Sequence, residues 1–246
     1  MIKVSGLNKN FEGFLALDNL NINIKKGSIY GLVGVNGSGK TTTIKHLAGV
    51  FKADSGQLLF DGEEIYDNPA VKAKIGYVAD DLYFFHGYNL KKLAKFYSKM
   101  YKTFNMERFD RLVGLTELDI KRRVSKFSKG MQKQAALTIA LSIMPEFLLL
   151  DEPIDGLDPI VRKKIFTEII DDVAARQMTV LISSHNLKEM DGICDSIGII
   201  KGGKMLMEKD LDELKTSMQN TMVSEHLPPS LDEIFIHVYE TGGGTA

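Results

Sequence analysis

The stretch Gly34-Val-Asn-Gly-Ser-Gly-Lys-Thr-Thr42 decides the fold, because it fits the pattern G-x-x-x-x-G-K-[ST]. An apolar segment, 29–33, precedes it, and a segment of helical character, 42–47, follows it. Between a strand and a helix, such glycines let successive backbone N–H groups point at phosphate oxygens, and the helix N-terminus adds its positive end. The alternative is a glycine-rich turn that binds nothing, and the complete strand–loop–helix context argues against it.

Each residue of this phosphate loop has an expected role. Lys40 supplies a positive charge to the β- and γ-phosphates, and the Thr41 hydroxyl is placed to bind Mg²⁺. The other candidate nucleotide-binding residues are Gly34, Asn36, Gly37, Ser38, Gly39 and Thr42.

Two acids follow a second apolar strand, at 147–150. In a parallel sheet of this class, the carboxyl end of such a strand lies beside the phosphate loop. Asp151 is therefore a candidate Mg²⁺ ligand, and Glu152 a candidate to polarise the attacking water. A strand that merely ends in solvated acids is the alternative, and the upstream phosphate loop makes it less favoured.

Composition narrows the possible partners. The chain has 246 residues, 31 basic and 32 acidic, for a net charge of −1, which gives no global attraction to nucleic acid or anionic lipid. We therefore expect no nucleic-acid partner. Cys194 is the only cysteine, so no intrachain disulfide can form. We find no apolar run of the roughly 20 residues that a membrane helix needs, so work at a membrane would go through a partner.

The pattern of apolar residues predicts an α/β fold. The first 80 or so residues show mainly strands and turns, 89–143 are helical, and strands and helices alternate again after Pro145. That alternation indicates a parallel sheet with helical crossovers. In the helical part, one face of a helix is predicted to carry Leu90, Leu93, Ala94, Tyr97, Met100, Tyr101 and Phe104, opposite a face of lysines.

Five ordered motifs resemble those of ABC ATPases from about residue 2 to 213. Besides the phosphate loop, Val124–Gln132 resembles the ABC signature, and Leu150-Asp-Glu-Pro153 follows the strand. Gly156-Leu-Asp-Pro159 resembles the D-loop, and Ser183-Ser-His185 resembles the switch-histidine segment. The form Ser-Lys-Gly-Met-Gln resembles bacterial exporter ATPases that carry drugs, peptides, polysaccharides or sodium.

The resemblance implies a phosphate-loop NTPase core of the RecA type with a parallel sheet, an N-terminal antiparallel β subdomain and an inserted α-helical subdomain. One ABC ATPase domain is expected at 1–213, with the helical subdomain at about 86–145 and a tail at 214–246 that ends in a helix. It further implies an ATPase, with ATP and Mg²⁺ bound, that pairs head to tail with a second copy or a related ATPase. Its expected place is the cytoplasmic face of the membrane, held there by a permease subunit.

The signature residues Ser128, Lys129, Gly130 and Met131 are expected to act in trans, on the nucleotide of the other subunit. Ser128 and Gly130 begin a predicted helix, and a helix N-terminus is a natural anion site. The chain already has one phosphate-binding helix N-terminus, in its phosphate loop. A second one is explained if it completes the nucleotide site of another copy. Lys129 and Met131 depart from the usual signature glycine and glutamine. The resemblance also assigns Asp158 to the D-loop.

Three further roles come from the resemblance. His185 would hydrogen-bond the γ-phosphate and hold the water and Glu152 in place. Asp80 stands where the family usually has glutamine, or sometimes glutamate, near Mg²⁺; its shorter side chain leaves a metal role and a plain loop position both open. Phe11 matches the aromatic residue that stacks on adenine, although core packing is an alternative, and Phe14 is then the second candidate.

The aromatic-rich segment 83–104 is the expected permease contact, because exposed aromatic residues are typical of interfaces. Two rivals to a transport ATPase remain. An ABC ATPase acting on DNA or ribosomes usually has a coiled-coil insertion or a second ATPase unit, and neither is present here. A nucleotide-binding regulatory module with little turnover is disfavoured by Glu152 and His185, and kept open by Asp80.

Overall fold

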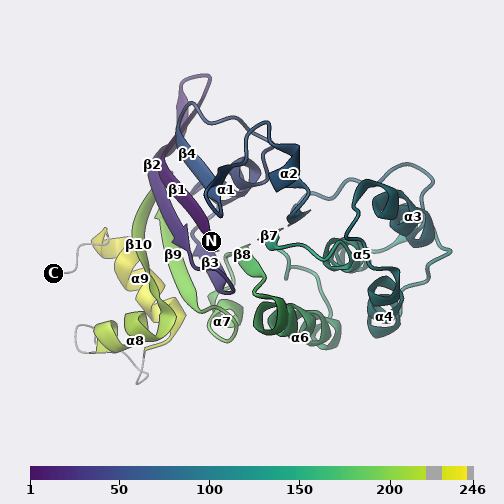
Figure 1. Ribbon diagram of the computed structural model, residues 1–246. Helices are drawn as coiled ribbons and strands as arrows, with labels where there is room; N and C mark the ends of the chain where they lie inside the picture. The colour runs from purple at the N-terminus through teal and green to yellow at the C-terminus, as the bar shows by residue number, and fades with distance from the viewer. Residues whose placement is uncertain (220–228, 243–246) are drawn as a thin grey trace.

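The computed structural model describes residues 1–219 and 229–242, and its centre is a six-stranded sheet in the order β10-β9-β3-β8-β7-β6 (Figure 1). The strands are β3 (Ile29–Val33), β6 (Ile75–Val78), β7 (Phe147–Asp151), β8 (Thr179–Ser184), β9 (Ser196–Lys201) and β10 (Lys204–Asp210). All neighbouring strands run parallel except β9 and β10. Strands β3, β7 and β8 are buried along their whole length, as apolar strands covered on both faces must be.

A second, antiparallel sheet has the order β2-β1-β4-β5. Its strands are β1 (Ile2–Phe11), β2 (Phe14–Ile24), β4 (Ser55–Phe60) and β5 (Glu63–Glu64). Apolar residues alternate with exposed ones in β2, so that Leu20, Ile22 and Ile24 face a core shared with helix α1 (Lys40–Leu47) and β3. The predicted α/β class, with an N-terminal antiparallel part beside a parallel sheet, is confirmed.

Helices cover the large sheet and join its core. They are α2 (Pro69–Lys72), α6 (Pro159–Arg176), α7 (Leu187–Met190), α8 (Leu211–Gln219) and α9 (Leu231–Thr241). Leu214 of α8 and Ile234 of α9 lie in the same apolar cluster as β7 and β8, which explains why these last helices pack at one end of the sheet (Figure 1). The predicted terminal helix corresponds to α9; residues 220–228 and 243–246 of the tail lie outside the described part. The boundary at 213 stays a prediction.

A separate helical layer lies at the opposite end of the molecule from α8 and α9 (Figure 1). It consists of α3 (Leu90–Met100), α4 (Met106–Thr116), the short 3₁₀ turn η1 (Val124–Lys126) and α5 (Lys129–Ser142). These elements have their own apolar cluster, which includes Leu93, Phe109 and Phe127. Ion pairs with buried acids of α6 tie the layer to that helix, with Arg108 Nη2 2.6 Å from Asp172 Oδ2.

The helix expected to run through Phe104 is shorter than predicted. It ends at Met100, which is 61% exposed, and α4 begins after Asn105, whose side chain accepts a hydrogen bond from the Arg108 N–H. An asparagine cap of this kind starts a new helix, because it satisfies a free backbone donor of the first turn. None of the described helices combines the length and apolarity needed to cross a membrane.

Candidate nucleotide site

Three parallel strands bring the predicted motifs to one edge of the sheet. The phosphate loop follows β3, Asp151 ends β7, and His185 follows β8. Since β8 lies between β3 and β7, their carboxyl ends open onto one crevice, the usual ligand position in such sheets. A cavity of about 270 Å³ lies there, and its lining residues are Phe14, Ala16, Asn36, Gly37, Gly39, Lys40, Thr41, Thr42, Asp80 and Glu152.

The phosphate loop holds its shape through close backbone contacts. A Cβ atom at Gly34 would lie 2.5 Å from the Ile200 carbonyl oxygen, so only glycine fits there. Gly39 has a φ of 113°, which side chains disfavour, and α1 starts directly after it. The buried Lys40 donates from Nζ to the Gly34 carbonyl at 2.8 Å. The loop thus presents a helix N-terminus and a buried cation to the cavity, an arrangement suited to phosphate.

Asp151 is fully buried, and its two carboxylate oxygens differ in their hydrogen bonding. Its Oδ1 accepts hydrogen bonds from Ser183 Oγ at 2.6 Å and from Thr41 Oγ1 at 3.2 Å. Its Oδ2 has no hydrogen-bond partner among the described residues. Burial raises the pKa of the Asp151 carboxyl, and the bonds from Ser183 and Thr41 oppose that rise. A buried carboxylate oxygen without a partner, next to a threonine hydroxyl, fits a hard divalent cation such as Mg²⁺.

Glu152 lies between a cation and a histidine. Its Oε2 is 2.9 Å from His185 Nδ1, and its Oε1 is 3.4 Å from Lys40 Nζ. The backbone of Glu152 has a φ of 46°, in the left-handed region. A carboxylate in contact with the lysine of the phosphate loop has the position predicted for a group that takes a proton from water. The geometry thus brings together Lys40, Glu152 and His185, as the sequence predicted.

Asp80 follows β6 and also lines the cavity. Its Oδ1 lies 3.2 Å from Nζ of Lys133, a buried residue of α5. Sequence reasoning missed Lys133, and also Ser183, whose hydroxyl bonds both Asp151 and the N–H of Glu152. Lys133 stands between two glutamines, so its polarity alone did not distinguish it from a solvated helix face. Ser183 could have been noted because it opens the switch-histidine segment, two residues before His185.

The signature residues lie at the start of α5. Ser128 is the N-cap, and its Oγ accepts from the Met131 N–H at 3.3 Å. A Cβ atom at Gly130 would collide with the carbonyl oxygen of Gly156, so the signature packs against the D-loop segment of its own chain. All four signature residues are described, and none is among the lining residues of the phosphate-loop cavity. Within one chain, the structure does not bring the signature to the phosphate loop.

Asp158, the predicted D-loop residue, caps the N-terminus of α6. Its Oδ1 accepts a hydrogen bond from the Ile160 N–H at 2.9 Å. Such a cap contributes about 1 kcal/mol to stability. This contact gives Asp158 a structural role within its own chain, and its predicted role toward a second subunit stays a prediction.

The two candidate stacking residues lie on opposite sides of a turn between β1 and β2. The Phe11 ring packs edge-on against Phe51, with centroids 5.4 Å apart, and Lys9 Nζ lies 5.2 Å from its centroid. Phe14 is 67% exposed and lines the phosphate-loop cavity. Phe14 thus lines the cavity, whereas Phe11 packs against another ring, and the predicted stacking role of either residue stays a prediction.

Phe14→Ala is expected to weaken nucleotide binding, because a base stacked on an aromatic ring gains about 1–3 kcal/mol. Phe11→Ala is the matched control, with the same atoms removed from the other side of the turn. Titration of each purified variant with a fluorescent ATP analogue measures the difference in Kd. A larger loss in Phe11→Ala than in Phe14→Ala would return the stacking role to Phe11.

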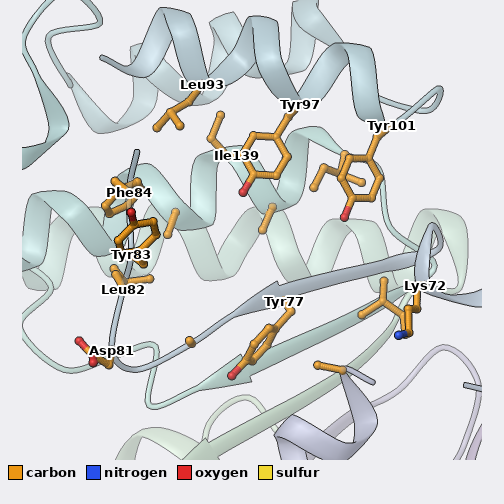
Figure 2. A pocket seen from close by; sticks show the side chains of 16 residues that line it. Lys72, Tyr77, Asp81, Leu82, Tyr83, Phe84, Leu93, Tyr97, Tyr101 and Ile139 are labelled. Carbon is orange, nitrogen blue, oxygen red and sulfur yellow. The ribbon is translucent and has the colours of Figure 1, made fainter. Parts of the chain in front are cut away.

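A second cavity, of about 400 Å³, lies between the helical layer and the sheet. Figure 2 shows Tyr97 of α3 and Tyr101, the residue directly after α3, pointing across this cavity toward β6, which carries Tyr77. Ile139 of α5 closes it from the side of the helical layer, and Tyr83, at its rim, is 86% exposed. Tyr97 and Tyr101 belong to the aromatic-rich segment that was predicted to contact a partner.

Fold and site together define a phosphate-loop NTPase, and comparison with known proteins identifies its family. The ABC transporter family matches residues 17–155. The chain is 35% identical, over 87% of its length and 74% of the relative's, to the ABC transporter ATP-binding protein YtrB of Bacillus subtilis. It is 37% identical, over 87% of its length and 71% of the relative's, to the bacitracin transport ATP-binding protein BcrA of Bacillus licheniformis.

Among solved structures, one described as an ATP binding subunit of an ABC transporter superposes with a TM-score of 0.87 at 22% identity, covering 97% of this chain and 99% of that one. The ADP- and phosphate-bound dimer of the cassette MJ0796 superposes with a TM-score of 0.77 at 23% identity, covering 86% and 99%. These two likenesses support the fold. The chain belongs to the ABC transporter family, as an ATP-binding subunit that hydrolyses ATP.

Proposed function

We propose that this subunit hydrolyses ATP in a site shared by two copies of the chain, with Glu152 as general base. The observation that carries the proposal is the contact of Glu152 with both Lys40 and His185, at 3.4 and 2.9 Å, at the edge of the phosphate-loop cavity. Lys40 and the loop N–H groups would hold the phosphates, and Glu152 would take the proton of the attacking water. His185 would keep the Glu152 carboxylate oriented, since its Nδ1 already contacts it.

The metal-binding part of the proposal rests on Thr41 and Asp151. Their side chains share a hydrogen bond of 3.2 Å, and the second oxygen of Asp151 is buried without a partner among the described residues. These two residues would hold Mg²⁺, and Asp80 would contribute through water because its carboxylate also serves Lys133. When bound, Mg²⁺ supplies positive charge to the phosphate oxygens of the transition state.

Two observations support pairing of copies head to tail. Each chain has two helix N-termini suited to anions, after Gly39 and after Ser128, and only the first lines its own cavity. Charge is also unevenly distributed: residues 86–145 hold 13 basic and 4 acidic side chains, and the remainder holds 18 basic and 28 acidic. A basic helical subdomain that carries the signature would be attracted to the acidic remainder of another copy.

A shared site makes hydrolysis depend on association. ATPase activity per chain is expected to rise with protein concentration until the chains are paired, and to fall when salt is raised at low protein concentration, because salt screens attraction between exposed charges. Steady-state rates across a dilution series at low and high salt measure both effects. Constant activity per chain at every dilution, with monomeric protein in sizing chromatography, would contradict a site made by two copies. If activity instead required a related ATPase, the pair would be a heterodimer.

The cavity between α3 and β6 is the proposed docking place for a membrane permease. Its walls are mostly apolar and aromatic side chains, with Tyr97 and Tyr101 directed into it and with Lys72 and Asp81 also in its lining (Figure 2). An apolar groove of this kind suits the apolar face of a partner's short helix. The subunit would thus lie on the inner face of the membrane, held by the permease. ATP-driven closing of the pair and reopening after hydrolysis would then move the permease. Relatives include the bacitracin transport protein BcrA and the lantibiotic transport protein SrtF of Streptococcus pyogenes.

A further inference from the structure

Lys133 makes two contacts that no motif assigns. Its buried Nζ donates to the backbone carbonyl oxygen of Glu152 at 2.5 Å and lies 3.2 Å from Asp80 Oδ1. Both partners lie on loops that end core strands, Glu152 after β7 and Asp80 after β6. Lys133 itself belongs to α5 and directly follows the signature segment Val124–Gln132. One ammonium group thus joins the signature helix to two strand ends at the nucleotide cavity.

The carbonyl that Lys133 holds belongs to a strained residue. Glu152 has a φ of 46°, a backbone conformation that residues with a side chain rarely adopt and that persists only when the surroundings enforce it. On one side, the Glu152 N–H donates to the Ser183 carbonyl at 3.2 Å and Oγ at 3.1 Å. On the other side, Lys133 holds the Glu152 carbonyl. The direction of the Glu152 side chain therefore depends on both ties.

A buried ammonium needs a counter-charge, and Asp80 supplies it. In the described part of the chain, Asp80 is the acid recorded in an ion pair with Lys133, and its own side chain is 56% exposed. Asp80 therefore keeps the Lys133 cation in place without being buried itself. This gives the aspartate at this position a function within the chain that is separate from metal binding.

We propose that Lys133 is a positioning residue for ATP hydrolysis: its bond to the Glu152 carbonyl aims the Glu152 carboxylate, and so links the place of the signature helix to the general base. The inference rests on the proposed role of Glu152. It predicts a defect in turnover and not in nucleotide binding, because Lys133 is not among the residues that line the phosphate-loop cavity.

Lys133→Met removes the donor and keeps the length of the side chain. We expect kcat to fall about 10- to 100-fold, since small displacements of a catalytic group have effects of this size, while the Kd for ATP changes less than about 2-fold. Lys133→Arg keeps a cationic N–H donor long enough to reach the carbonyl and should retain more of kcat than Lys133→Met. Equal losses in the two variants would show that the carbonyl bond is not the cause, and would overturn the proposal.

A double variant distinguishes loss of Glu152 positioning from a general loss of active structure, because the effects of two residues that act together on kcat do not add. In the Glu152→Gln background, adding Lys133→Met should lower the residual rate by no more than about 3-fold, because the group that Lys133 aims is already gone. A further 10-fold loss would show that Lys133 acts elsewhere. If Glu152→Gln alone kept full activity, the proposed base would fail, whereas normal turnover of Lys133→Met beside an inactive Glu152→Gln would reject only the role of Lys133.

Arg108→Met is the matched control. Arg108 is a cation of the helical layer whose side chain is 11% exposed, and it lies 2.6 Å from Asp172. It also ties that layer to the core, and it is not among the residues that line the nucleotide cavity. Loss of this ion pair should lower the melting temperature and leave kcat of the folded protein within about 2-fold. A kcat loss in Arg108→Met equal to that in Lys133→Met would mean that attachment of the layer, and not the aim of Glu152, is what turnover requires.

Discussion

Glu152→Gln is expected to lower ATP turnover by about 10²–10⁴-fold, the usual share of a positioned general base. Glutamine keeps the shape of the side chain and can still contact His185, so the site should stay folded around it. What the change removes is the capacity to take a proton from water. Glu146→Gln is the control, because Glu146 is an exposed residue just before the start of the same strand, β7. ATPase assays on both variants measure the effect.

The same substitution should make the paired state visible. ATP binding survives in Glu152→Gln while hydrolysis stops, so the closed dimer should accumulate. In sizing chromatography the variant should elute as a dimer with Mg-ATP and shift toward monomer with ADP. Adding Ser128→Arg should block the dimer, because a bulky cationic side chain would then fill the space at the α5 N-terminus meant for phosphate.

Two results would contradict this account. If Glu152→Gln hydrolyses ATP at the normal rate, another group activates the water. If it loses hydrolysis but stays monomeric at saturating ATP and high protein concentration, self-pairing is wrong, and a heterodimer with a related ATPase becomes the alternative. The two outcomes can be distinguished because the first is measured as an ATPase rate and the second as the size of the protein in chromatography.

Lys40→Ala should abolish productive ATP binding. Lys40 is buried, donates to the Gly34 carbonyl at 2.8 Å and is the cation that lines the phosphate-loop cavity together with Glu152. Loss of two charge-assisted hydrogen bonds to phosphate, at about 1.5–3 kcal/mol each, corresponds to a Kd raised by at least about 100-fold. Calorimetric titration with ATP and the ATPase rate both measure it.

Lys45→Ala is the control for Lys40→Ala, since Lys45 lies on the same helix and its Nζ faces the Phe51 ring, 5.6 Å from the centroid. That variant should bind ATP as the unchanged chain does. Near-normal hydrolysis in Lys40→Ala would refute the assignment of the phosphate site. Folding of each variant is checked by circular dichroism, because Lys40 also bonds its own loop.

Short motifs determined the class of protein and the centre of its site. The phosphate loop requires a strand, a tight glycine turn and a helix in sequence order, and β3 and α1 occupy those places. Asp151 and Glu152 could be placed beside the loop because parallel strands end at one edge of a sheet. These inferences depend on local spacing and on one rule of topology, so they needed no knowledge of distant contacts.

Only the tertiary structure decided which side chains face the nucleotide cavity, because this depends on how a helix is rotated and on which side of a turn a residue lies. Phe11 and Phe14 are separated by only two residues, Glu12 and Gly13, and the sequence does not say which ring faces the cavity. The packing of Phe11 against Phe51 distinguishes the two rings. No pattern in the sequence singled out Lys133, yet its place on α5 relative to β6 and β7 buries it against Glu152. Such contacts join segments far apart in sequence, and their free energy depends on how whole elements pack, which no local pattern of residues encodes.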